Sequence, residues 1–152
     1  PFSGIYSASK NLIDLKKNKK IDQQVNTVSL FWETIGENMD QWKGVRVGNL
    51  SASEVRRDFI HTHVIILQAL GHMGKDLLKQ FPTNWKSKLK NLNKINWLKN
   101  NSVWQQRVII NGRVVKNNNS IILASNVIKK ALGIKLDAKE KALESQVKKS
   151  GK

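Results

Sequence analysis

Residues 51–71 read SASEVRRDFIHTHVIILQALG, and this stretch decides the fold. Ser51 followed three residues later by Glu54 is the signature of a capping box, which marks the start of a helix. At 100° per residue, the apolar side chains from Val55 to Leu70 cover most of the circumference. One narrow polar stripe remains, formed by Glu54, Arg57, Asp58, His61 and Gln68. The stretch therefore predicts a central buried helix from about residue 51 to about residue 70, ending at Gly71.

The rest of the chain is also predicted to be mainly helical. Apolar spacing predicts helices over 3–17, 22–39, 84–92, 102–107 and 121–132, and one that begins at Asp137. A short helix is expected to reach Gln80 after a bend at Gly71, and residues 40–49 read as a polar connection. Ser120 is the expected N-cap of the 121–132 helix, and Gly133 is its expected end.

One β-hairpin interrupts this helical pattern. Asn111-Gly112 stands between two β-branched runs, and it supplies the positive φ angles of a type I′ turn. We therefore predict a mainly α-helical domain around the central helix, with one small β-hairpin at about 108–115. Three regions are expected: an N-terminal helix and basic linker over 1–20, a helical core over 21–136, and a C-terminal helix with a basic tail over 137–152.

The charge distribution points to a polyanionic partner. The 152 residues carry a formal net charge of +16, and no acidic residue lies between Asp76 and Asp137. Like charges repel one another and destabilise the folded state, so such a surface is typical of a protein that binds nucleic acid. The residues expected to contact duplex DNA are Lys86, Lys88, Lys90, Lys94, Lys99, Arg107, Arg113, Lys116, Asn118, Lys129 and Lys130.

Several of these positions also have a plainer interpretation. Arg113 and the asparagines that follow the hairpin could read base edges, but a surface hairpin that only covers the core is favoured. Lys129 and Lys130 also complement the dipole of their helix. Burial is favoured over base stacking for the tryptophans of this segment, Trp85, Trp97 and Trp104.

The sequence contains little that indicates catalysis or metal binding. Cysteine is absent, and no phosphate-binding Gly-rich loop or nucleophile motif is found. His61 and His63 are two residues apart and would point about 200° away from each other on a helix. We expect His63 in the core, a structural hydrogen-bond network for Arg57, Asp58 and His61, and neither a metal nor a cofactor.

The expected location is the cytoplasm, on the nucleoid. The longest uninterrupted apolar run considered as a membrane segment, Val64–Leu67, is four residues, which is far below a transmembrane length. The chain begins Pro1-Phe2-Ser3-Gly4, and this start reads as a piece of a longer protein.

Several short segments, in their order and spacing, carry a family resemblance. They are Phe31-Trp32-Glu33, Trp42, Ser51–Asp58, His61–His63, Leu67–Gly71, Pro82–Trp85, Ile95–Trp97, Trp104, Asn111–Arg113 and Ile128–Gly133. With these segments the chain resembles the C-terminal half of the DndB proteins, the regulatory component of bacterial DNA phosphorothioation (DNA sulfur modification) systems, within the DGQHR-domain group. The Asp-Gly-Gln-His-Arg motif itself is absent, as expected if the N-terminal half is missing.

The resemblance implies a DNA-binding transcriptional regulator, a repressor of the modification gene cluster, without enzymatic chemistry of its own. Duplex DNA is the implied partner, other DNA modification proteins are possible partners, and the missing half is where a homo-oligomer would form. Two alternatives stay open. One is a nuclease-like enzyme that uses Asp58 and His61. The other is a protein-interaction module that binds through the edge of the 51–70 helix.

Overall fold

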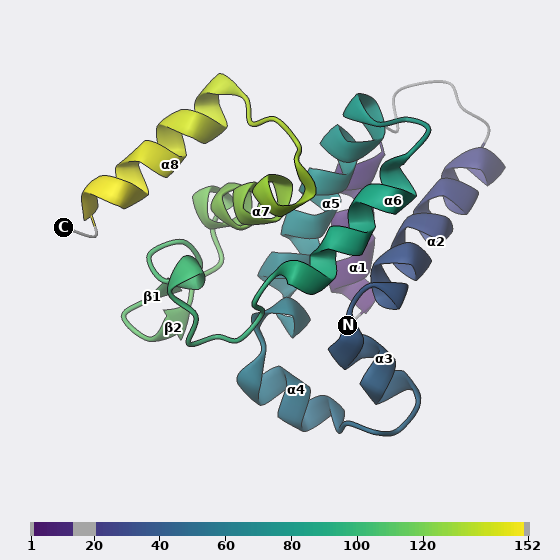
Figure 1. The fold of residues 1–152 in the computed structure, drawn as a ribbon, viewed down its shortest axis with the longest axis horizontal. Coiled ribbons are helices and arrows are strands. Elements are labelled where there is room, and N and C mark those ends of the chain that lie inside the picture. Colours follow the sequence, from purple (N-terminus) through teal and green to yellow (C-terminus); the bar gives the residue numbers. More distant parts are fainter. Residues whose placement is uncertain (1, 14–20, 151–152) are drawn as a thin grey trace.

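The structure is a computed structural model that describes residues 2–13 and 21–150. Within these residues it has eight α-helices, three short 3-10 helices and one two-stranded antiparallel sheet (Figure 1). The α-helices are α1 Phe2–Leu12, α2 Ile21–Glu37, α3 Asp40–Arg46, α4 Ala52–Asp58, α5 Val64–Gln80, α6 Trp85–Leu89, α7 Asn118–Leu132 and α8 Ala138–Ser150. The 3-10 helices are η1 Ile60–Thr62, η2 Lys90–Lys94 and η3 Ser102–Trp104, and the strands are β1 Ile109–Ile110 and β2 Arg113–Val114. The predicted fold class is confirmed.

The central helix differs from the predicted one at both ends. The capping box of Ser51 and Glu54 is present, but it starts the short helix α4, and the chain leaves helical geometry at Phe59. There the Ile60 N–H donates to the Trp97 carbonyl at 2.9 Å, and Phe59 pairs with Leu98 in an isolated β-bridge. A backbone partner distant in sequence therefore breaks the helix, and the buried helix α5 begins only at Val64.

Helix α5 does not end at Gly71, because this glycine and Gly74 serve close packing. A Cβ added at Gly71 would lie 2.1 Å from the Ala8 carbonyl oxygen of α1, and one at Gly74 would lie 2.4 Å from the Phe31 ring of α2. Only glycine lets the backbones approach this closely, and packing offsets its unfavourable helix propensity. The helix therefore continues to Gln80, with α1 and α7 packed against it.

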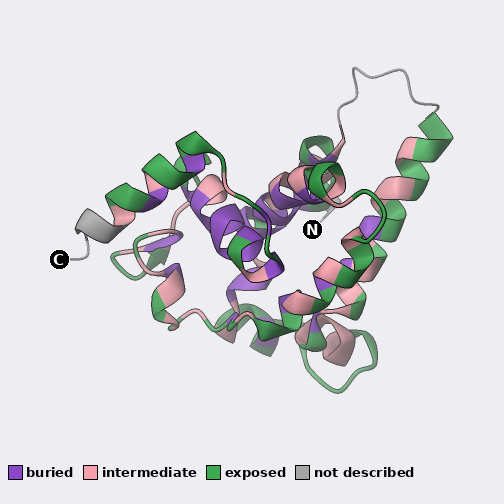
Figure 2. Ribbon diagram, turned by 45° about the horizontal axis from the view of Figure 1, so that its top comes forward, coloured by how far each residue is buried: buried purple, intermediate pink, exposed green. Residues whose placement is uncertain are grey.

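The hydrophobic core surrounds α5. Figure 2 shows buried residues gathered along the middle of the molecule, with exposed turns on the outer helices α2 and α8. Trp97 and Trp104 are buried, stack with ring centroids 5.4 Å apart, and donate their indole N–H groups to the carbonyls of Leu92 and Asn96. Burial is thus confirmed for these two tryptophans, whereas Trp85 is half-buried against Phe31.

The other local predictions have mixed outcomes. The hairpin is confirmed, with φ of 50° at Asn111 and 73° at Gly112, and Gly133 ends α7 at φ 71°. The polar connection predicted over 40–49 is wrong for residues 40–46, which form α3. The N-cap of α7 is Asn117, whose side chain accepts from the Ser120 N–H, and Ser120 itself is a buried helical residue. The basic run over 16–20 lies outside the described residues.

Candidate nucleic-acid interface

Five exposed basic residues lie along the segment that runs from α6 through the hairpin to the start of α7. In Figure 1 this segment runs from α6 through η2 to β1 and β2, across the near side of α5. Lys86, Lys90, Lys94, Arg113 and Lys116 are exposed there, and none of them forms an ion pair with a described residue. We call these five residues the exposed basic set. Asn118 at the start of α7 is also exposed.

Lys88 is adjacent to this set but is partly committed to the protein. Its side chain is half-buried, and its ammonium lies 4.4 Å from the centre of the Phe81 ring. This cation–π contact holds the ammonium close to the loop that connects α5 to α6. Lys88 therefore adds positive charge near α6 but is less free to reach a phosphate than Lys86 or Lys90.

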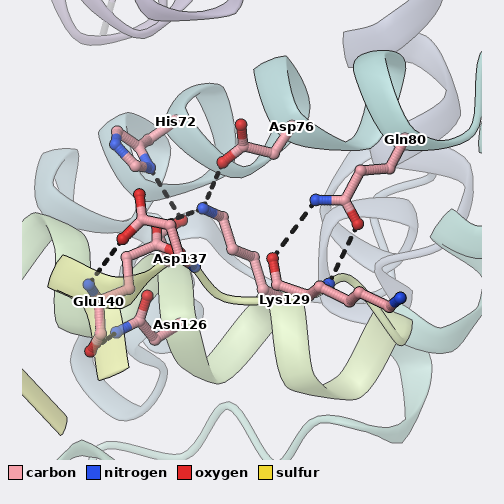
Figure 3. A network of polar contacts seen from close by, with 9 residues as sticks. His72, Asp76, Gln80, Asn126, Lys129, Asp137 and Glu140 are labelled. Carbon is pink, nitrogen blue, oxygen red and sulfur yellow. Dashed lines mark hydrogen bonds and ion pairs between the residues drawn. The ribbon is translucent and has the colours of Figure 1, made fainter. Parts of the chain in front are cut away.

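Lys129 contradicts its prediction as a DNA contact. Its side chain is completely buried, and its ammonium forms ion pairs with Asp76 of α5 and Glu140 of α8 (Figure 3). Glu140 also accepts from the Asp137 N–H at 3.0 Å, so the cap of α8 and this ion pair share one side chain. A buried ammonium with two carboxylate partners joins three helices and cannot reach DNA in this fold.

Arg107 and Lys130 share a second carboxylate from α8. The Arg107 guanidinium donates to Glu144 at 3.0 Å and the Lys130 ammonium donates to it at 2.5 Å, while Arg107 also donates to the Val103 carbonyl. Burial raises the pKa of Glu144, but the hydrogen bonds from the two cations outweigh it and leave the pKa below its usual value. The charges of Arg107 and Lys130 are therefore partly neutralised, and their contact with DNA stays a prediction.

Lys99 has a structural role at the end of α4. Its ammonium donates to the carbonyls of Arg56 at 2.7 Å and Arg57 at 2.8 Å, which are free acceptors in the last turn of the helix. Partial burial lowers the pKa of Lys99. No pattern in the sequence indicates this contact, because the two segments are 42 residues or more apart. A DNA contact by Lys99 is likewise untested.

His61 is fixed in a buried aromatic cluster. The Trp42 indole donates to Nδ1 at 3.0 Å, so the ring proton is on Nε2, which faces Gln41 Oε1 at 3.2 Å. The ring stacks on Phe59 and meets Trp97 edge-on. Burial lowers the pKa of His61 to about 4, with a smaller effect of His63, so the ring is neutral at pH 7.

The polar stripe of the sequence therefore does not form one site. Arg57 and Asp58 pair with each other near the surface at 2.9 Å, and no hydrogen bond joins Asp58 to His61, although the structure describes both residues. Both ring nitrogens of His61 already have partners. This arrangement matches the structural network expected for His61 and provides no acid–base pair of Asp58 with His61. The prediction that His63 lies in the core is wrong, because this residue is only half-buried.

Sequence reasoning missed a cluster that centres on His72. Over the described residues, one group of three potential metal ligands is found, His72, Asp76 and Glu140, with ligand atoms within 4.8 Å of one another. The Lys129 ammonium pairs with both carboxylates, so it takes the place that a metal cation would have between them (Figure 3). His72 contacts Ser125 Oγ at 3.2 Å, and burial followed by the Lys129 charge lowers the pKa of His72.

A groove of about 520 Å³ lies beside the exposed basic set. It is bounded by the hairpin, the first turn of α7 and the second half of α8, which lie near one another in Figure 1. The asparagines 117–119 and Ser120 line it, together with apolar side chains such as Ile110 and Leu143. The predicted asparagine loop is therefore one wall of a groove.

Comparison with known proteins gives one match. The family model DndB, described as DNA-sulfur modification-associated, matches residues 1–135. No curated protein and no solved structure matches the chain. Among the residues that the structure describes, no helix is long and apolar enough to cross a membrane.

Proposed function

This chain belongs to the DndB family of DNA-sulfur modification-associated proteins, and from this premise we propose that it is a DNA-binding transcriptional regulator, a repressor, of a phosphorothioation gene cluster. It would act on the nucleoid as a binding protein without chemistry of its own. A regulator of this kind must hold duplex DNA, and phosphate contacts provide most of that affinity.

The observation that carries the proposal is the exposed basic set. Lys86, Lys90, Lys94, Arg113 and Lys116 remain exposed after all internal ion pairs of the described residues are assigned. A protein does not need five unpaired cations on one continuous segment to fold, and their mutual repulsion is unfavourable. Phosphates of a DNA duplex would neutralise them and release condensed counterions.

Salt dependence tests the proposal quantitatively. If all five cations contact phosphate, the logarithm of the affinity for duplex DNA should fall against the logarithm of salt concentration with a slope of about −4.5. Fluorescence anisotropy with the promoter of the native modification cluster and a shuffled duplex would measure it. A preference for the promoter would indicate that base readout lies within residues 1–152.

Charge reversal provides the matched test. Lys86→Glu, Lys90→Glu and Lys94→Glu together should abolish binding, while thermal unfolding stays near that of the native protein because these side chains make no ion pair. The control is a second triple variant, with lysine replaced by glutamate at Lys10, Lys139 and Lys141, which are exposed on α1 and α8. It changes the net charge by the same amount. Equal loss in both triple variants would mean that net charge alone, and not this segment, holds the DNA.

A second candidate function, docking of another modification protein, is favoured by a separate feature. A hollow of about 330 Å³ lies along α4, and its lining is mostly apolar: Trp42, Val45, Ala52 and Val55, with Arg56 and Thr62. Pull-down with the purified modification proteins after nuclease treatment, at high salt, tests it. Val45→Asp should remove such a partner and leave the DNA affinity unchanged.

The enzyme alternative has its own direct test. A nuclease would nick supercoiled plasmid in the presence of a divalent metal, and His61→Ala would abolish that activity. We expect no nicking by either protein, because both ring nitrogens of His61 are engaged with Trp42 and Gln41.

A further inference from the structure

Helix α8 is attached to the rest of the protein with little apolar contact. Between residues 138 and 147, the side chains that are not exposed lie at helical spacing: Glu140, Leu143, Glu144 and Val147. Of these four, only the two glutamates are buried, and both pair with cations of α7. Most helices are fixed to a protein by burial of an apolar face, so the attachment of α8 depends unusually on its carboxylates.

The start of α8 is held more firmly than its second half. The connection before it is fixed by the buried Ile134 and by Gln80, whose side chain bonds both the N–H and the carbonyl of Lys135, at 3.1 and 3.3 Å. Glu140 in the first turns belongs to the buried network of Lys129. Over residues 141–147, Glu144 is the one buried side chain. The second half of α8 is therefore the part that can detach at low cost.

Glu144 binds the protein in the way that a phosphate would. Its two carboxylate oxygens accept from Nε and Nη2 of Arg107 at 3.4 and 3.0 Å, and one of them also accepts from the Lys130 ammonium. A guanidinium fork matches a carboxylate and a phosphate alike. Arg107 lies two residues before β1 and borders the groove beside the hairpin, so this covered pair of cations adjoins the exposed basic set.

The placement of charges on α8 is specific. Lys139 and Lys141 are exposed, whereas Glu140 and Glu144 are turned to α7. The DndB family model matches residues 1–135, so the cations of α7 lie inside the matched part and α8 lies outside it. The cations thus belong to the part of the chain that identifies the family, and the carboxylates that cover them do not.

We propose that α8 is an autoinhibitory segment, in which Glu144 occupies the place of a DNA phosphate and keeps Arg107 and Lys130 out of the DNA-binding surface. The inference rests on the proposed function, which brings duplex DNA to the adjoining hairpin. When the second half of α8 detaches, the two cations lose their shared carboxylate and become available to phosphate. Lys129 keeps its partner on α5 and stays structural. While it is docked, α8 lowers the affinity of the chain for DNA.

Neutralising this carboxylate in the full 152-residue chain tests the inference. Glu144→Gln keeps the shape of the side chain but removes its charge, so two further cations can contact phosphate. We expect the affinity for duplex DNA at about 0.1 M salt to rise about tenfold or more, and the salt slope to steepen by about 1.8, which is about 0.9 for each added contact. Glu33→Gln, at an exposed position on α2, changes the net charge equally and should leave the slope unchanged.

Further substitutions identify the cations and the moving segment. Adding Arg107→Gln and Lys130→Gln to Glu144→Gln should return the slope to that of the native protein, because the extra contacts require these two side chains. Amide hydrogen exchange measures the attachment of α8 directly. The amides of residues 141–147 should exchange faster in Glu144→Gln than in the native protein, while those of α7 stay protected.

A second variant loosens α8 without changing any charge. Leu143 is half-buried and lines two hollows between α7 and α8, so Leu143→Ser weakens the docking and leaves Glu144 intact. It should also raise the DNA affinity and steepen the salt slope. Leu30→Ser, at an exposed position on α2, is the matched control and should do neither.

The outcomes separate the two proposals. If Glu144→Gln gains no more affinity than Glu33→Gln, or if the gain persists after Arg107 and Lys130 are also neutralised, α8 is not autoinhibitory, whereas DNA binding by the exposed basic set stands on its own charge-reversal test. If neither the native protein nor Glu144→Gln binds duplex DNA at low salt, the proposed function fails, and the inference fails with it.

Discussion

Replacement of Lys129 by methionine tests the three-helix ion-pair network most directly. Methionine keeps most of the side-chain volume but removes the charge, so that Asp76 and Glu140 lose their shared partner. Removing one member of a buried ion pair costs about 3–5 kcal/mol. Because the Asp76 side chain is 34% exposed and can be hydrated, we take the lower end, about 3 kcal/mol. For a chain of this size, that corresponds to a fall in Tm of roughly 6–12 °C.

Thermal and urea unfolding of Lys129→Met measure the effect, with Lys130→Met as the matched control. Lys130 is the next residue, and its side chain is 49% exposed in its pair with Glu144. The same substitution there should cost at most about 1 kcal/mol. DNA affinity gives the complementary readout: Lys129→Met should leave it unchanged at a temperature where the variant is folded.

Two results would refute this reasoning. Equal stability of Lys129→Met and the native protein would show that the network contributes nothing to folding. A loss of DNA affinity with unchanged stability would mean that Lys129 becomes accessible and contacts phosphate after all. Lys129→Ala removes the ammonium and leaves room for a metal ion between His72, Asp76 and Glu140. Zn²⁺ should therefore raise the Tm of this variant and not that of the native protein.

Two further predictions concern the core. His61 has a folded-state pKa of about 4 against 6.5 in the unfolded chain, so the unfolded state binds a proton first as pH falls. The free energy of unfolding contributed by neutral His61 should therefore be fully present at pH 7, decrease below pH 6.5, and be about 2 kcal/mol lower at pH 5. Urea unfolding at a series of pH values measures this, and the pH dependence should be weaker in His61→Gln. An unchanged pH dependence in this variant would exclude His61 as the cause. Gly71→Ala should lower the free energy of unfolding by about 3 kcal/mol, because its Cβ would meet the Ala8 carbonyl oxygen. Gly36→Ala is the control: open space surrounds this position, so the substitution should stabilise α2 by about 0.5–1 kcal/mol. Calorimetry compares the two variants, and similar effects of both would contradict the close approach of α1 to α5.

The parts of the fold that the sequence predicted correctly are those with local causes. The turn at Asn111-Gly112, the capping box at Ser51 and the end of α7 at Gly133 each depend on residues within a few positions. The errors arise where a distant segment intervenes. Trp97 pairs with the backbone at Ile60 and breaks the predicted central helix, and no pattern within residues 51–71 contains that information.

Contacts between distant segments also decide which residues of the candidate interface are available, so the stretch without acidic residues in the sequence is not without acidic neighbours in the structure. Between Asp76 and Asp137 the sequence shows only positive charge, but in space Asp76, Glu140 and Glu144 come back to it from α5 and α8. These three carboxylates neutralise the cations of α7 and Arg107 and none of those of α6, η2 and the hairpin. Counting charges along the chain could therefore not separate a structural lysine from an exposed, unpaired one. That separation rests on tertiary ion pairs, and it is why the DNA-binding proposal depends on Lys86, Lys90 and Lys94 and not on Lys129.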